Sequence, residues 1–172
     1  MAGRDGTVVK PLVFKAGRKN EIGAMLASSL LWGALMGLSA GLGLLFREWQ
    51  TSGLIGSVVV LFIFGGIVAY APAVGIARRL GRNLAAERRF ALAFLLLSSA
   101  TIGVTAITYA VQYRLYYSEW HDAPFTVRWL FEVGFTTAAA LYQFAVMGMA
   151  LLFPVGLVAL LGASLLFALR ND

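Results

Sequence analysis

Residues 78–89 read RRLGRNLAAERR and stand between two long apolar stretches. This short segment holds five of the fourteen Lys and Arg residues of the chain. Five more precede the first apolar stretch, and Arg170 follows the last one. Because Lys and Arg concentrate in the cytoplasmic loops of membrane proteins, this pattern predicts that residues 78–89 and both termini lie on the cytoplasmic face of a membrane.

The composition agrees with a membrane protein. Of the 172 residues, 60% are hydrophobic and only 13% are charged, and a transmembrane helix needs about 20 apolar residues. We predict a basic cytoplasmic tail, residues 1–21, and an all-α four-helix transmembrane domain, residues 22–172, with spans at about 22–46, 54–76, 90–113 and 137–169. The net charge of +6 then reflects topology rather than nucleic-acid binding. Dense basic loops and the excess of Arg over Lys favour a bacterial inner membrane.

The last apolar stretch, residues 125–169, is too long for one simple span. As a single helix, its 45 residues would measure ~67 Å, over twice the ~30 Å hydrocarbon layer. We predict an amphipathic interfacial helix at about 125–135, which bends into a final span kinked near Pro154. The alternative is that this stretch crosses the membrane twice.

Two rows of small residues recur at a spacing of four. The first apolar stretch carries Ser29, Gly33, Gly37 and Gly41, and the second carries Gly65, Ala69, Ala73 and Ala77. Each row forms a ridge without large side chains, which allows another helix to approach closely. We expect the two ridges to pack against each other as helix-interface residues of an antiparallel hairpin. The alternatives are an oligomer or partner interface and a pore-lining face.

Hydroxyl groups mark one face of the third apolar stretch, where Thr101, Thr105 and Thr108 follow at spacings of four and three. Such groups bond to their own helix or to a neighbour such as Gln143. The simplest interpretation is that they join helices. The alternative is a polar path for a transported solute, with Tyr142 and Gln143 on its opposite side.

An aromatic segment separates the third and fourth predicted helices. Its rings form a girdle typical of a membrane interface and comprise Tyr109, Tyr113, Tyr116, Tyr117 and Trp120. His121 with Glu119 and Asp122 could hold a metal only in a tightly folded loop, so we expect a solvated interfacial loop instead. Arg128 and Glu132, four residues apart, are predicted to pair on one helix face.

The cationic residues predict contact with anionic lipid headgroups. About ten basic side chains would lie close to the cytoplasmic surface, and each is worth roughly 1 kcal/mol of attraction there. In residues 78–89 the headgroup ligands are Arg78, Arg79, Arg82, Arg88 and Arg89.

What the sequence lacks guides the functional prediction. It has no cysteine. No Asp, Glu, Lys, Arg or His lies within a predicted span, since Arg128 and Glu132 are expected at or above the outer interface, and this disfavours a proton or ion pump. No catalytic motif is present. We predict a non-enzymatic accessory or scaffold subunit of a larger membrane complex, without cofactor or metal, that contacts lipids and other membrane subunits or copies of itself. The alternative is a small transporter or channel component, and the aromatic girdle alone suggests a pigment or quinone subunit.

Overall fold

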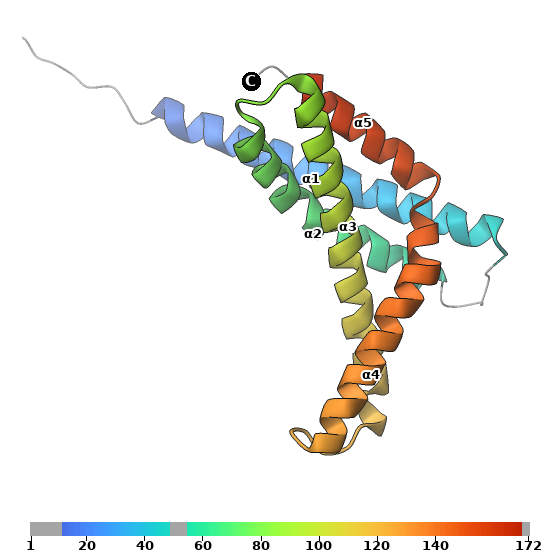
Figure 1. The fold of residues 1–172 in the computed structure, drawn as a ribbon. Helices are drawn as coiled ribbons and strands as arrows, with labels where there is room; N and C mark the ends of the chain where they lie inside the picture. Colours follow the sequence, from blue (N-terminus) through green and yellow to red (C-terminus); the bar gives the residue numbers. More distant parts are fainter. Residues whose placement is uncertain (1–11, 49–54, 170–172) are drawn as a thin grey trace, which may run out of the picture.

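The computed structural model describes residues 12–48 and 55–169, with side chains from Asn20 onward. In this part of the chain the structure is helical and contains no β-strand. Its α-helices are α1 (Leu12–Phe46), α2 (Ile55–Gly81), α3 (Ala86–Tyr117), α4 (Val127–Gln143) and α5 (Val155–Leu169) (Figure 1). A helix satisfies its backbone hydrogen bonds within itself, which is what an apolar chain in a membrane requires.

Four helical segments are long and apolar enough to cross a membrane: Asn20–Phe46, Ile55–Gly81, Ala86–Trp120 and Val127–Leu152. The prediction of an all-α chain with four such segments is confirmed. The first three coincide with predicted spans, although the second and third continue further than expected, to Gly81 and Trp120. α1 begins at Leu12, within the predicted tail. Residues 1–11 of that tail lie outside the described part of the chain.

The helices follow one another as packed neighbours. α1 packs along α2, α2 packs along α3, and α3 contacts both α4 and α5. Residues 82–85 join α2 to α3 in a short turn, in which the Leu84 amide donates to the Gly81 carbonyl at 3.1 Å. Figure 1 shows that α4 and the second half of α3 lie side by side and project beyond the other helices. We call this projecting pair, residues 109–143, the arm.

Two apolar clusters join the helices at different depths. The first contains Trp32, Met36, Ala73, Val74, Leu97 and Leu160 and includes α5. The second contains Ala40, Leu44, Leu61, Phe62, Phe144 and Leu151 and includes the segment that follows α4. Both clusters contain residues of α1 and α2. The later helices therefore pack against this pair of helices.

The last apolar stretch departs from the prediction. α4 runs as one α-helix from Val127 to Gln143 and so passes through residue 136, where the Thr136 and Thr137 hydroxyls donate to carbonyls of their own helix at 2.7 Å. A π-helical turn (Phe144–Gly148) and a 3₁₀ turn (Met149–Leu152) follow α4. The fourth long apolar segment is therefore residues 127–152, and residues 137–169 do not form the one continuous helix that was expected.

The helix ends at Phe153 instead of kinking. Phe153 has extended backbone angles, φ −108° and ψ 144°, because Pro154 lacks an N–H and its ring disfavours helical conformation in the residue before it. α5 begins at Val155. Its 15 residues measure ~22 Å, short of the ~30 Å hydrocarbon layer.

The two small-residue ridges do not face each other along their length. A Cβ atom at Gly33 would lie 2.6 Å from the Ile63 carbonyl oxygen, so the ridge of α1 receives the β-branched side chains of α2. Gly65, in the ridge of α2, instead contacts Thr105 of α3. The close glycine contact between α1 and α2 is made by Gly66, where a Cβ would lie 2.9 Å from Gly33 Cα. The expectation that both ridges meet in one interface therefore fails at Gly65.

Candidate functional site

The break between α4 and α5 leaves backbone groups without helical partners inside an apolar bundle. Ser39 of α1 supplies the missing partners, because its hydroxyl donates to the Leu151 carbonyl at 3.0 Å and accepts from the Gly156 N–H at 3.1 Å. The Ser39 side chain is completely buried, with 0% exposure. An unpaired backbone group is costly in apolar surroundings. One hydroxyl thus stabilises both sides of the break.

A second side chain, from the residue that follows the end of α1, contacts the same break. Arg47 Nη1 donates to the Ala150 carbonyl at 2.8 Å. A cation at the carbonyl end of a helix is favoured by the helix dipole, and a charged donor strengthens the hydrogen bond. Ser39 and Arg47 lie about two helical turns apart, so α1 and the residue that follows it fix the end of the segment that follows α4 at two points.

A groove of about 750 Å³ lies beside this break, between α2, α3 and the segment after α4. Its wall is apolar and aromatic, with the Phe144 ring centroid 6.2 Å from those of both Phe62 and Tyr109. At its edge the Tyr109 hydroxyl donates to Gln143 Oε1 at 2.8 Å. Apolar walls with a few polar groups are typical of binding sites. The groove can accept an apolar side chain or an amphipathic molecule.

The π-helical turn shapes this groove. An added Cβ at Gly148 would lie within 3 Å of the Phe144 ring, so only glycine allows that ring to fold against the helix. The ring is then buried, with 4% exposure, and joins the second apolar cluster. π-turns are rare in helices and occur often at functional sites. The turn therefore marks the groove as the best candidate site of the described chain.

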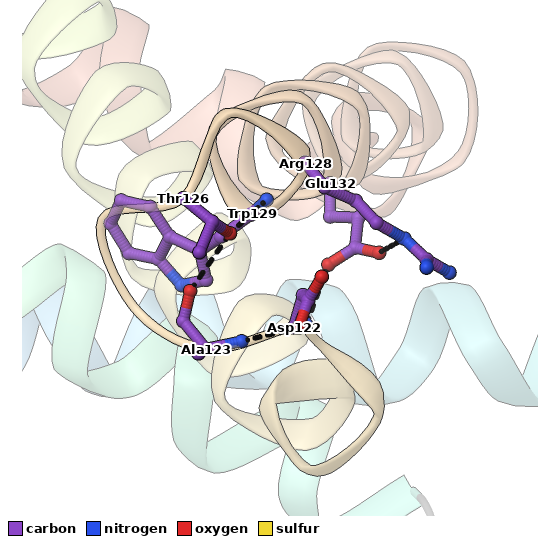
Figure 2. A network of polar contacts seen from close by, with 6 residues as sticks. All are labelled: Asp122, Ala123, Thr126, Arg128, Trp129 and Glu132. Atoms are coloured by element: carbon purple, nitrogen blue, oxygen red, sulfur yellow. Dashed lines mark hydrogen bonds and ion pairs between the residues drawn. The ribbon is translucent and has the colours of Figure 1, made fainter.

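The tip of the arm is held by polar contacts (Figure 2). The Glu132 carboxylate accepts from the Asp122 N–H at 2.8 Å and from Arg128 Nε at 3.1 Å. The predicted pairing of Arg128 with Glu132 is thus confirmed. Thr126 caps α4, because its hydroxyl accepts from the Trp129 N–H at 3.1 Å. These contacts fix the direction in which α4 returns along α3.

Two buried side-chain atoms have no hydrogen-bond partner among the described residues, His121 Nε2 and Ser164 Oγ. His121 lies in a shallow hollow of the arm beside Arg128 and Glu132. The described part of the chain holds no group of three or more His, Asp and Glu side chains arranged to bind a metal.

The residues of the predicted polar path lie in separate places. Thr101 accepts a hydrogen bond from Trp32 Nε1 at 3.1 Å, and Thr105 is buried against Gly65. Thr108 bonds to a carbonyl of its own helix at 2.8 Å and lines a different hollow, between α2 and α3. Tyr142 is 72% exposed, whereas Gln143 lies in the groove beside Tyr109. Gln143 therefore contacts Tyr109 of the aromatic girdle and not the three threonines.

The predicted headgroup arginines cluster at the opposite end of the bundle from the arm. Arg78, Arg79, Arg82 and Arg88 are exposed around the turn that joins α2 to α3. Arg89 is half-buried and donates to the Phe167 carbonyl of α5 at 3.2 Å.

Sequence reasoning missed Ser39, Arg47 and Phe144. Ser39 stands among small residues but outside the ridge, and Arg47 directly follows the first predicted span. The available signal was Pro154, because a break inside an apolar stretch requires a hydrogen-bonding side chain from elsewhere. The sequence contains several such hydroxyls and does not indicate which one is used.

Comparison with protein-family models, with curated proteins and with solved structures finds no match for this chain. The class of protein is therefore defined by the fold itself. Four helices of sufficient length and apolarity make this an α-helical protein of the multi-pass membrane type.

Proposed function

We propose that the protein is a non-enzymatic accessory or scaffold subunit of a larger membrane complex, and that it contacts its partner through the arm and the adjoining groove. We further propose the membrane to be a bacterial inner membrane. In this proposal the arginine-rich turn and both termini face the cytoplasm and the tip of the arm faces the other side, in accord with the distribution of basic residues.

The uncovered surface of the arm carries this proposal. α4 makes its main contacts with α3 and with the π-helical turn that follows it, which leaves its other faces exposed. Phe131, Phe135 and Leu141 are 62%, 73% and 42% exposed. The ridge of α1, in contrast, is already occupied by α2. The arm is thus a better candidate for a partner interface than the small-residue ridge of α1.

The length of α3 supports the same assignment. Residues 86–120 form 35 residues of continuous helix, ~52 Å long, which exceeds the ~30 Å hydrocarbon layer. If α3 stands upright, its aromatic end reaches beyond the lipid, where exposed rings are favoured by a protein partner. The alternative role in transport has less support, because Thr101 and Thr105 are buried in helix contacts away from Gln143.

Site-specific photo-cross-linking in native membranes tests the proposal. A photoreactive residue at Phe135 is expected to give a protein adduct of discrete mass, since this position lies on the uncovered face of the arm. Leu166 of α5 is the matched control, because the two side chains are similarly exposed, at 73% and 68%. Gel electrophoresis and mass spectrometry identify the adducts. Absence of a protein adduct at Phe135, or the same adducts at both positions, would contradict the proposal.

A further inference from the structure

A second groove lies at the arginine-rich end of the bundle, bounded by α1, α2, α3 and α5. It measures about 510 Å³ and is separate from the groove beside the arm. Two arginines, Arg78 and Arg89, contribute to its lining together with Trp32, Tyr70 and apolar side chains. A cavity that is cationic at one end and apolar along its length selects for an anionic amphiphile.

The cationic end is positioned by the fold. Arg78 lies in the last turn of α2, and Arg89 lies in the first turn of α3. The Arg89 guanidinium donates to the Phe167 carbonyl at 3.2 Å and lies 5.6 Å from the centre of the Phe167 ring. These contacts hold its charge at the groove. Guanidinium groups bind phosphate oxygens in a planar, bidentate geometry.

The local charge favours the same ligand. Residues 78–89 contain five arginines and one acid, Glu87, which gives a net charge of +4 (five minus one). Such a cluster beside a membrane attracts anionic headgroups by roughly 1 kcal/mol for each cation near the surface.

The apolar part of the groove has the dimensions of an acyl chain. Arg78 and Tyr70 line the same groove eight residues apart, ~12 Å along the helix, compared with ~15 Å for one hydrocarbon leaflet. At the deep end the Trp32 and Tyr70 rings lie 5.9 Å apart. On the α5 side the groove has open space at Gly162, because a Cβ atom added there would have no heavy atom within 4 Å. Small residues on α5 thus create the space for a chain.

We infer that this groove is a binding site for an anionic phospholipid. The phosphate lies between Arg78 and Arg89, and one acyl chain follows α2 toward Trp32 and Tyr70. A soluble anion would bind the arginines and leave the apolar part of the groove empty. A neutral lipid would fill the apolar part but would bring no net negative charge to the arginines. This site is independent of the proposed accessory role and of the arm.

Native mass spectrometry of the full-length protein tests the inference. Delipidated protein in detergent is titrated with phosphatidylglycerol or with phosphatidylcholine of the same acyl chains, and bound lipid is counted from the mass. We expect tighter binding of phosphatidylglycerol. Replacing Arg78 and Arg89 together by Gln is expected to weaken that binding about 25-fold, at roughly fivefold for each charged contact with the phosphate that is lost.

Matched variants separate a defined site from general attraction to the surface. R82Q with R88Q removes the same charge outside the groove, and we expect phosphatidylglycerol to bind almost as in the unchanged protein. Gly162→Phe fills the apolar part of the groove without altering charge and is expected to weaken binding, whereas Gly75→Phe, also in open space but outside the groove, is not. Equal binding of both lipids, an equal loss in R82Q/R88Q, or no effect of Gly162→Phe would overturn the inference.

Discussion

Gly33→Val is expected to destabilise the protein by about 1–3 kcal/mol, the usual range for an overpacked interior position. A Cβ at this position would lie 2.6 Å from the Ile63 carbonyl oxygen. That oxygen belongs to the backbone of α2 and cannot rotate aside as the Ile67 side chain can. α1 and α2 must therefore move apart, and both apolar clusters depend on this pair of helices.

The expected loss arises from packing and not from helix propensity. Valine is a better helix former than glycine in peptides, so propensity alone would stabilise α1. Between membrane helices no hydrophobic drive compensates for a lost close contact, because lipid chains are as apolar as the side chains. The variant thus measures how much the close approach of α1 to α2 contributes.

Thermal unfolding in detergent, followed by circular dichroism and size-exclusion chromatography, checks this prediction. Gly23→Val is the matched control in the same helix, because a Cβ at Gly23 would have no heavy atom within 4 Å. Gly41→Val should fall between the two, since its nearest neighbour is the Val59 side chain at 3.5 Å. Equal destabilisation by all three substitutions would refute the assigned contact.

The sequence predicts the first three membrane helices well because the relevant physics is local. A run of about 20 apolar residues can satisfy its backbone in lipid only as a helix. Spacing also predicts which residues share a helix face, as it does for Gly33 and Gly37. It does not predict the partner of that face. Neighbouring positions 65 and 66 point ~100° apart, and Gly65 meets α3 whereas Gly66 meets α1.

The conformation of the last apolar stretch, residues 125–169, could not be predicted from local sequence rules. Pro154 marks a disruption, but a kinked helix and two separate helices both satisfy that requirement. The outcome depends on whether another segment provides hydrogen bonds to the freed backbone groups. Ser39 does so from more than one hundred residues away. The groove beside the break was missed for the same reason, because its walls come from α2, α3 and the segment after α4.

Ser39→Ala is expected to destabilise the break between α4 and α5, while the same substitution at Ser164 is expected to be neutral or stabilising. Both serines are completely buried, with 0% exposure. The Ser39 hydroxyl serves the Leu151 carbonyl and the Gly156 N–H, and each of these groups would lose a buried partner worth ~1–3 kcal/mol. Ser164 Oγ has no partner in the described chain, so its removal relieves a desolvation penalty.

The pair of variants isolates hydrogen bonding from burial, because the two sites lose the same atom from equally buried positions. Thermal unfolding in detergent gives the overall change, and hydrogen exchange at the Gly156 amide reports the break itself. Faster exchange at Gly156 in Ser39→Ala alone is the expected pattern, since the amide then lacks its acceptor. Equal effects of both variants on stability and exchange would mean that Ser39 acts only as a small packing residue, and that Pro154 and Arg47 suffice to hold the two helices apart.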